Sequence, residues 1–289
     1  MHTPLGFCTP LKGKRLDCMI KLIATDMDGT LLDSRKQLPQ ENIDAIQAAV
    51  AAGIKIVICT GRSKAGVKPY FDRLGLTEEE YVILNNGCSV HETLNWSTLY
   101  GQPLKTEDIL DLQAHVDANP EVDLVLATNK DYYFIGENPS AIAQADADMV
   151  FTKIHPISKE AIARIEEPVY NAMYMGEAEA IDDFQAKNEK VINAHYSGVR
   201  SQTFLYEVMT KGYHKATGLA HLANHLGIES GNIMAIGDAN NDLELLNYAG
   251  LAVAMGNASD TIKEQANKVT KSNNQAGVAY AIKEFALKI

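Results

Sequence analysis

Two aspartates separated by one residue follow the first apolar run of the sequence. Residues 20–25 (IKLIAT) are apolar enough for a buried strand, and Asp26 and Asp28 come directly after them within residues 26–30 (DMDGT). Side chains at positions i and i+2 of an extended segment point to the same side, so the two carboxylates are expected to lie close together. A buried pair of like charges needs a cation or a shared proton, and oxygen-only ligands suit Mg²⁺. The motif therefore predicts a magnesium site, with an Asp-rich turn after a strand as the structural alternative.

The same pair of carboxylates has the chemistry that phosphoryl transfer requires. A carboxylate can attack phosphorus and form an acyl-phosphate, which divides one difficult hydrolysis into two easier displacements. A second carboxyl group nearby can protonate the leaving alkoxide and later deprotonate the attacking water. The motif is thus typical of a phosphoryl-transfer site.

A second acidic motif lies towards the end of the chain. Asp238 ends the apolar run 232–238 (NIMAIGD), and Asp242 lies near the start of the next predicted helix. Capping of that helix explains Asn240 or Asn241 without any chemistry. A carboxylate at the mouth of a buried strand needs a partner, and metal ligation is the simplest explanation of Asp238.

Groups that could bind a phosphate follow another apolar run, residues 54–60. A hydroxyl and free backbone N–H groups ahead of a helix can bind an anion, and Thr60, Gly61 and Arg62 occupy such a position. A simple turn is the alternative interpretation of this segment.

A cation is also expected to face the phosphate, and two lysines are candidates. Lys215 begins an amphipathic helix, whereas Lys211 lies in the connection before it. An ammonium group at an anchored helix start loses less side-chain entropy on binding than one in a linker, so Lys215 is favoured. The alternative is that both lysines are solvated.

These motifs fall at strand ends within a regular alternation of strands and helices. Alternating βα units imply an α/β fold with a doubly wound parallel (Rossmann-like) sheet, whose ligands bind beyond the carboxyl ends of its strands. Residues 85–87 (NNG) form a further strand end of this kind. The predicted strands are 20–25, 54–60, 81–87, 232–238 and 251–257, and the predicted helices follow Pro39 and span 63–75, 215–226 and 241–249.

The middle of the chain has a different pattern. The apolar segments 122–128 and 131–136 are separated by two residues only, which is typical of an antiparallel hairpin. Residues 105–209 are therefore predicted to form an α+β cap domain, inserted into a catalytic core made of 19–104 and 210–289. Residues 1–18 show no periodicity and are predicted to be a dispensable N-terminal extension. Further predicted elements of the cap are helices over 158–167 and 177–188 and strands over 169–176 and 202–208.

Taken in order, DMDGT, a hydroxyl-bearing strand end, a later lysine and GDxxND resemble the haloacid dehalogenase (HAD) superfamily of phosphatases. The insertion resembles that of the Cof-type subgroup, which has a large α/β cap. The sequence departs from the family pattern at Ala216, where a glycine usually follows the lysine. The resemblance implies a Mg²⁺-dependent phosphatase that acts on a small phosphorylated metabolite, with sugar phosphates as the first expectation.

The resemblance also implies a role for each motif residue. Asp26 would be the nucleophile and Asp28 the acid/base, and Asp26, the Asp28 carbonyl and Asp238 would hold Mg²⁺, with Asp242 supporting the metal. The phosphate-binding and substrate-binding set would be Met27, Thr60, Gly61, Arg62, Lys215 and Asn241.

Composition limits the possible partners. The chain has 289 residues and a net charge of −11, and nucleic acid and anionic membranes would both repel such a protein. No segment approaches the ~20 apolar residues of a membrane span. Four scattered cysteines do not form a disulfide scaffold, which favours a reducing, cytoplasmic location. The sequence does not indicate an oligomeric state.

Other functions fit parts of this pattern. His221 and His225 form an H-x-x-x-H pair but lie opposite the apolar stripe of their helix, where solvated side chains are expected instead of zinc ligands. A receiver-type signalling module would also place an aspartate and a lysine together, but a base at Asp28 would shorten the lifetime of its acyl-phosphate. A phosphotransferase or mutase of the same fold is a further alternative, and so is a sugar-phosphate-binding protein without turnover.

Overall fold

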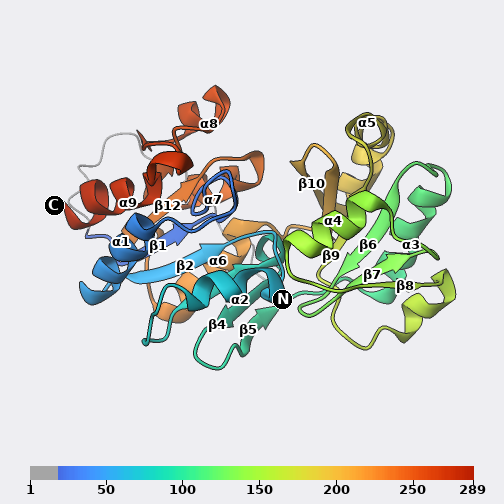
Figure 1. Ribbon diagram of the computed structural model, residues 1–289, viewed down its shortest axis with the longest axis horizontal. Helices are drawn as coiled ribbons and strands as arrows, with labels where there is room; N and C mark the ends of the chain where they lie inside the picture. Colours follow the sequence, from blue (N-terminus) through green and yellow to red (C-terminus); the bar gives the residue numbers. More distant parts are fainter. Residues whose placement is uncertain (1–18) are drawn as a thin grey trace, which may run out of the picture.

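The computed structural model describes residues 19–289, which form two lobes, each built around its own sheet (Figure 1). The predicted N-terminal extension, residues 1–18, lies outside the described residues. Within the described part of the chain, no helix is both long enough and apolar enough to span a bilayer.

The first lobe contains an eight-stranded sheet in which β1 (Leu22–Thr25) lies between β12 (Ile233–Gly237) and β2 (Lys55–Cys59). Both neighbours run parallel to β1, with Ala24 opposite Ala235 on one side and Val57 on the other. Beyond β12 lie β13 (Leu251–Ala254) and then the edge strand β14 (Lys268–Val269). Beyond β2 lie β3 (Tyr81–Leu84), β4 (Ser89–Glu92) and the edge strand β5 (Thr98–Gly101). Only β4 and β5 are antiparallel to their neighbours, so the predicted doubly wound parallel core is confirmed.

Helices cover both faces of this sheet, because its strands are apolar on both sides (Figure 1). On one face, α1 (Gln40–Ala51), α2 (Lys64–Asp72) and α9 (Gly277–Ala281) pack on alternate strand residues such as Ile23 and Ile56. On the other face, α6 (Lys215–Leu226), α7 (Leu243–Tyr248) and α8 (Asp260–Gln265) pack on the intervening residues, such as Leu22 and Val57. Helix α6 begins at Lys215 and ends at Leu226, as predicted.

The second lobe contains a six-stranded, mainly antiparallel sheet in the order β10-β11-β9-β6-β7-β8. Its strands are β6 (Asp123–Ala127), β7 (Tyr132–Ile135), β8 (Ile154–Ile157), β9 (Asn171–Met175), β10 (Tyr196–Gln202) and β11 (Leu205–Thr210). Helices α3 (Thr106–Asp117) and α5 (Ala178–His195) cover one face, and α4 (Ala141–Met149) covers part of the other. The predicted hairpin is confirmed, since β6 and β7 pair antiparallel.

Several boundaries in this lobe differ from the prediction. The helix predicted for 177–188 continues to His195, and β10, which follows it at once, was not predicted. The strand predicted for 202–208 is instead the turn of the β10–β11 hairpin followed by β11. The segment predicted as a helix over 158–167 is a short 3₁₀ turn, Lys159–Arg164. Helix α4, which is rich in alanine and aspartate, was missed because its apolar stripe is narrow.

The end of β3 fixes where α6 begins. Asn85, Asn86 and Gly87 all have positive φ angles (52°, 52° and 98°), which turn the chain sharply after the strand. A Cβ atom at Gly87 would lie 2.0 Å from the carbonyl oxygen of His214 and 3.0 Å from the backbone nitrogen of Lys215. A glycine is therefore needed here for α6 to begin at this point.

We expect Gly87→Ala to lower the free energy of unfolding by ~3 kcal/mol or more, because it adds a backbone clash to a positive φ. Gly212→Ala is the matched control, since Gly212 also has a positive φ (80°) but open space around its Cβ position. The control should lose only ~1 kcal/mol. Urea denaturation of the two variants measures the difference, and equal losses would contradict the packing argument.

Candidate active site

The predicted motifs meet at one edge of the parallel sheet. Asp26 follows β1, Thr60 follows β2, Asn85 follows β3 and Asp238 follows β12, and these four strands are neighbours in the order β12-β1-β2-β3. Carboxyl ends of parallel strands lie at the same edge, and the structure brings Lys215 to that edge as well.

Lys215 is buried between two carboxylates. Its Nζ lies 2.6 Å from Asp26 Oδ1 and 2.6 Å from Asp242 Oδ1, and its side chain is 1% exposed. Burial opposes the charge of the ammonium group, but Asp242 and Asp26 outweigh this effect and raise the pKa of Lys215. Ala216 is buried and does not displace the start of the helix. Lys215 is therefore a fixed, permanently charged group between the two acidic motifs.

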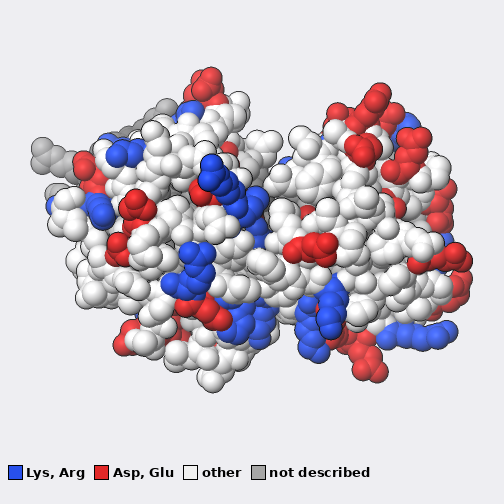
Figure 2. All heavy atoms as spheres, in the orientation of Figure 1, with Lys and Arg blue, Asp and Glu red and all other residues white. Residues whose placement is uncertain are grey.

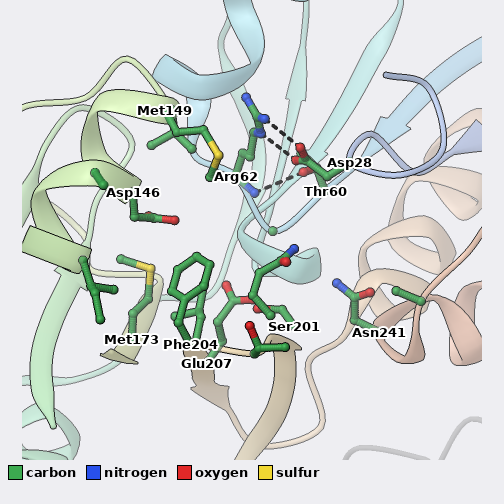
Figure 3. Close-up of a pocket in the computed structure, with 18 of the residues that line it drawn as sticks. Asp28, Thr60, Arg62, Asp146, Met149, Met173, Ser201, Phe204, Glu207 and Asn241 are labelled. Carbon is green, nitrogen blue, oxygen red and sulfur yellow. Dashed lines mark hydrogen bonds and ion pairs between the residues drawn. The ribbon is translucent and has the colours of Figure 1, made fainter. Parts of the chain in front are cut away.

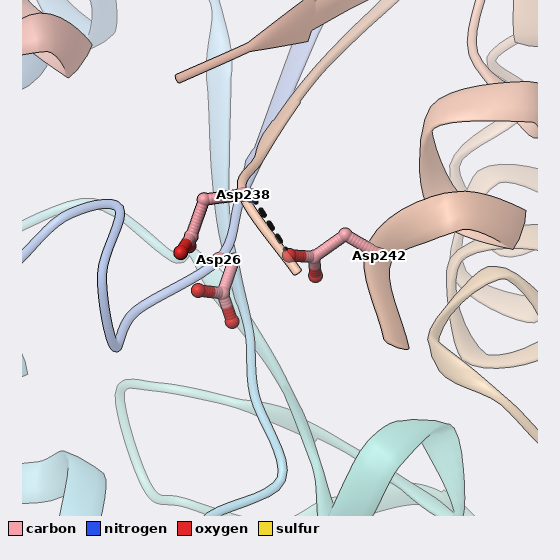
Figure 4. A group of neighbouring side chains, drawn as sticks. All are labelled: Asp26, Asp238 and Asp242. Atoms are coloured by element: carbon pink, nitrogen blue, oxygen red, sulfur yellow. Dashed lines mark hydrogen bonds between the residues drawn. The ribbon is translucent and has the colours of Figure 1, made fainter. Parts of the chain in front are cut away.

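Asp26, Asp238 and Asp242 form an acidic cluster, each with one oxygen within 4.8 Å of the others (Figure 4). Burial and the charge of Asp242 raise the pKa of Asp26 well above its usual range, and burial raises the pKa of Asp238 to about 6. Lys215 supplies one positive charge against three carboxyl groups. The cluster therefore suits a further cation, and its oxygen-only donors are of the kind that Mg²⁺ prefers.

The hydrogen bonds of the cluster distinguish its members. Both oxygens of Asp242 are occupied, Oδ1 by Lys215 and Oδ2 by the backbone N–H groups of Asp238 and Ala239, each at 3.0 Å. Asp26 has Lys215 on Oδ1 only. Asp26 and Asp238 are thus the members with oxygens suited to a metal, whereas Asp242 orients its neighbours.

Thr30 and Gly29, from the first motif, hold Asp238 in place. Thr30 Oγ1 donates a hydrogen bond of 2.6 Å to Asp238 Oδ1. Gly29 has a φ of 85°, and a Cβ there would lie 2.4 Å from Asp238 Oδ2. The first motif therefore shapes the second through these two residues as well as through Asp26.

Asp28 pairs with two cations, of which Figure 3 shows Arg62. Arg62 holds it in a two-pronged ion pair, Nε to Oδ2 and Nη2 to Oδ1, both at 2.7 Å, and Lys36 Nζ lies 2.7 Å from Oδ1. Burial would raise the pKa of Asp28, but Arg62 and Lys36 outweigh it and lower the pKa to about 2. In this arrangement Asp28 is held as a carboxylate.

The other predicted phosphate ligands differ in what they present to the site. Thr60 and Gly61 line the cleft, and Thr60 Oγ1 accepts a hydrogen bond of 3.2 Å from the backbone N–H of Arg62. Asn241 lines it from the opposite side, within reach of Asn86 at 3.3 Å. The side chain of Met27 is fully buried in the hydrophobic core, so only its backbone could face a phosphate.

A cleft of about 610 Å³ opens in front of these residues, between the two lobes. Figure 2 shows it as a groove with Lys and Arg side chains on the side of the first lobe. The second lobe contributes residues from α4, β9 and the β10–β11 hairpin (Figure 3). Those labelled in the close-up are Asp146, Met149, Met173, Ser201, Phe204 and Glu207.

Sequence reasoning missed several of these residues. Lys36 lies in an irregular turn, and nothing in its local sequence distinguishes it from a solvated lysine. Glu207 did carry a signal, because it interrupts the apolar strand β11. Asn86 belongs to a strand end that is visible in the sequence, but no role was predicted for it.

Fold and site together define a hydrolase of the haloacid dehalogenase class. The chain belongs to the haloacid dehalogenase-like hydrolase family, which matches residues 23–282. The Bacillus subtilis protein YxeH is 36% identical over 277 residues, which cover 93% of this chain and 99% of YxeH. The 5-amino-6-(5-phospho-D-ribitylamino)uracil phosphatase YwtE of the same organism is 30% identical over 296 residues, covering 92% of this chain and 98% of that protein.

Solved structures share the whole fold, including the cap. The HAD subclass IIB sugar phosphatase BT4131 matches with a TM-score of 0.77 at 24% identity, covering 92% of this chain and 99% of that one. The predicted family, with its Cof-type cap, is confirmed. The chain is a HAD-type phosphatase.

The ion pairs of Asp28 predict that the free energy of unfolding decreases as the pH falls below about 4. A carboxyl group whose pKa falls from 3.8 to about 2 on folding stabilises the fold fully above pH ~4 and loses this contribution as the pH falls towards 2. The difference in unfolding free energy between wild type and Asp28→Asn should therefore shrink by ~2 kcal/mol between pH 5 and pH 2. Urea denaturation in EDTA measures it, and a pH-independent difference would show that Asp28 is not held ionised.

Proposed function

We propose that this phosphatase is Mg²⁺-dependent and hydrolyses a small phosphorylated metabolite, a sugar phosphate, through a covalent phosphoryl-Asp26 intermediate. The observation that carries this proposal is the arrangement at the end of β1. Asp26 is buried with one oxygen held by Lys215, and Asp28, two residues on, lines the same cleft.

The acidic cluster supports the metal. Asp26 and Asp238 would hold Mg²⁺ with the backbone carbonyl of Asp28, while Asp242 orients Asp238 and Lys215. When bound, Mg²⁺ would offset the negative charge of the carboxylates and of a phosphate dianion, which could not otherwise share one cleft.

In the first half of the reaction, an oxygen of Asp26 attacks phosphorus as the bond from phosphorus to the leaving oxygen breaks. The leaving alkoxide takes a proton from Asp28. Lys215, Thr60, the backbone N–H of Gly61 and Asn241 would bind the phosphoryl oxygens, since they line the cleft or, for Lys215, contact Asp26.

In the second half, water attacks the phosphoryl group on Asp26 and transfers a proton to Asp28. The bond between Asp26 and phosphorus breaks, and phosphate leaves. Asp28 is a carboxylate at this point because it has given its proton to the leaving group, and it accepts a proton more readily the further Arg62 and Lys36 are from it, since both cations lower its pKa. To donate a proton in the first half, Asp28 must first lose its ion pairs with Arg62 and Lys36 and become protonated. An incoming phosphate dianion would favour this, because it would attract both cations.

The division of the chain follows from the two sheets. We propose a core of residues 19–104 and 210–289 and a cap of 105–209. The first boundary follows β5, which ends at Gly101, and the second lies within one residue of the end of β11 at Thr210. The sugar-phosphate assignment is supported by the names of two relatives, a sugar phosphatase and a phosphatase of a phosphoribityl compound. A cytoplasmic location is part of the proposal, in keeping with free, buried thiols at Cys59 and Cys88.

Loss of the nucleophile should abolish turnover. We expect phosphate release from sugar phosphates to require Mg²⁺ and to fall to background in Asp26→Asn, which keeps the side-chain shape but cannot form the intermediate. Phosphate release with and without EDTA measures this, and trapping of labelled phosphate on the wild-type protein locates the intermediate. Full activity in EDTA or in Asp26→Asn would refute the proposal.

The two lysines should behave differently. Lys215→Ala is expected to reduce kcat/KM by ~10²-fold or more, because it removes a buried cation between the nucleophile and Asp242. Lys211→Ala is the control, since Lys211 is exposed and its ammonium group donates to the carbonyl of Asn193 in the cap. Comparable losses in both variants, with both proteins folded by circular dichroism, would contradict the assignment of Lys215.

A further inference from the structure

Two buried carboxyl groups face the cleft from the cap. Asp146, on α4, is 6% exposed, and Glu207, on β11, is 4% exposed, and both line the cleft opposite Asp28 and Arg62 (Figure 3). Neither belongs to a motif of the phosphoryl-transfer site.

Glu207 reaches the boundary between the phosphate region and the rest of the cleft. A Cβ atom at Gly61 would lie 3.3 Å from Glu207 Oε1, which places this carboxyl group against the phosphate-binding turn. Asn171, from the adjacent strand β9, donates a hydrogen bond to the same oxygen. Glu207 is therefore held where the first atoms of a leaving group would lie.

No positive charge offsets these carboxyl groups on the cap side. Among the described residues that line the cleft, the cap contributes the acidic residues Asp146, Glu177 and Glu207 and no lysine, arginine or histidine. The cleft-lining cations, Lys36 and Arg62, belong to the core and pair with Asp28.

The pKa values of the two carboxyl groups reflect this lack of nearby positive charge on the cap side. Burial, together with the charge of Glu207, raises the pKa of Asp146 to about 6, and burial raises the pKa of Glu207. Tyr132 and Ser201 also line the cleft beside these carboxyl groups, and no group in the described part of the chain has the distance and angle of a hydrogen bond to Ser201 Oγ, although this hydroxyl is close enough to Glu207 to favour its ionised form. Buried acceptors of this kind are stabilised by a ligand that brings hydrogen-bond donors.

Apolar side chains complete the cap side of the cleft. Met149, Met173 and Phe204 surround the two carboxyl groups (Figure 3). The cap side of the cleft thus combines hydrogen-bond acceptors for hydroxyl or ammonium groups with apolar area for C–H groups. A polyol carries both hydroxyl groups and C–H groups, so this surface suits a polyol.

We infer that Asp146 and Glu207 determine the specificity for the leaving group: they accept hydrogen bonds from its hydroxyl or ammonium groups and reject leaving groups that carry a carboxylate or a second phosphate. This inference rests on the proposed function, since it concerns the same cleft. It adds that the substrate has one anionic group, the phosphate that is transferred.

Substrates that differ in leaving-group charge test the inference. Because 6-phosphogluconate is an open chain and the two other esters are mainly pyranose rings, the change of each preference between wild type and variant carries the test. Glucosamine 6-phosphate, glucose 6-phosphate and 6-phosphogluconate share a six-carbon skeleton and carry a positive, a neutral and a negative leaving group. One buried unit charge at close range is worth about tenfold or more in kcat/KM. At about pH 7.5, where Asp146 is ionised although burial raises its pKa to about 6, the wild type should therefore prefer each of the first two over 6-phosphogluconate by at least about tenfold.

Removing the charges should reduce this preference. Asp146→Asn and Glu207→Gln should each lower the ratio of kcat/KM for glucose 6-phosphate to that for 6-phosphogluconate several-fold. Asp148→Asn is the matched control, because Asp148 lies on the same helix but is exposed and does not line the cleft, so its ratio should equal that of wild type. Asp146→Asn provides the test alone if Glu207→Gln does not fold, since Glu207 also bonds Asn171.

Where an ester is bound but not turned over, its inhibition of p-nitrophenyl phosphate hydrolysis measures its affinity. The three esters should then rank in affinity as they rank in kcat/KM. Equal inhibition by all three, tighter binding of 6-phosphogluconate, or an unchanged ratio in both cap variants would overturn the inference. Absence of Mg²⁺-dependent and Asp26-dependent phosphate release from every compound, p-nitrophenyl phosphate included, would instead refute the proposed function.

Discussion

The site is organised around one buried ammonium group. Lys215 bonds Asp26 and Asp242 at 2.6 Å each, and so connects the end of β1, the start of α6 and the turn after β12. A buried charge of this kind is stable only when it is paired and hydrogen-bonded, so its two partners must be held as firmly as the lysine. Packing of α6 on the sheet and the tight approach of Gly87 to the start of α6 supply that rigidity.

The same stretch of chain links the site to the cap. Glu207 on β11 lies against Gly61, and the chain then passes out of the cap sheet and starts α6 at Lys215. The residue proposed to contact the leaving group, Glu207, and the residue proposed to contact the phosphate, Lys215, therefore lie on consecutive elements of the chain, β11 and α6. Any movement of the cap relative to the core would displace Glu207 from the phosphate-binding turn while Lys215 stays with the core, which makes the position of the cap a condition for recognising the leaving group.

The core and its site were largely predictable because each signal is local. A strand that ends in Asp26 or Asp238 is visible in a few residues, and parallel topology then brings the strand ends together without further information. The cap was less predictable. Strand β10 contains glycine, serine and arginine and shows no clear alternation of apolar and polar residues. Helix α4 exposes much of its surface, so its apolar residues show no strong helical periodicity. Contacts such as Lys36 with Asp28 depend on the path of an irregular turn, which no period describes.

The ion pairs of Asp28 impose an order on the proposed reaction. With Arg62 and Lys36 in contact, Asp28 is ionised and cannot protonate a leaving group. A phosphate dianion in the cleft would compete for the same two cations, and the pKa of Asp28 would rise towards that of a usable acid as each cation moves away from it. The acid form of Asp28 would then be favoured only when a phosphate is present. After the leaving group departs with that proton, Asp28 is a carboxylate, and it can accept a proton from the attacking water while the phosphoryl group still holds Arg62 and Lys36. Once phosphate has left, the two cations return to Asp28, lower its pKa and restore the ion pairs of the free protein.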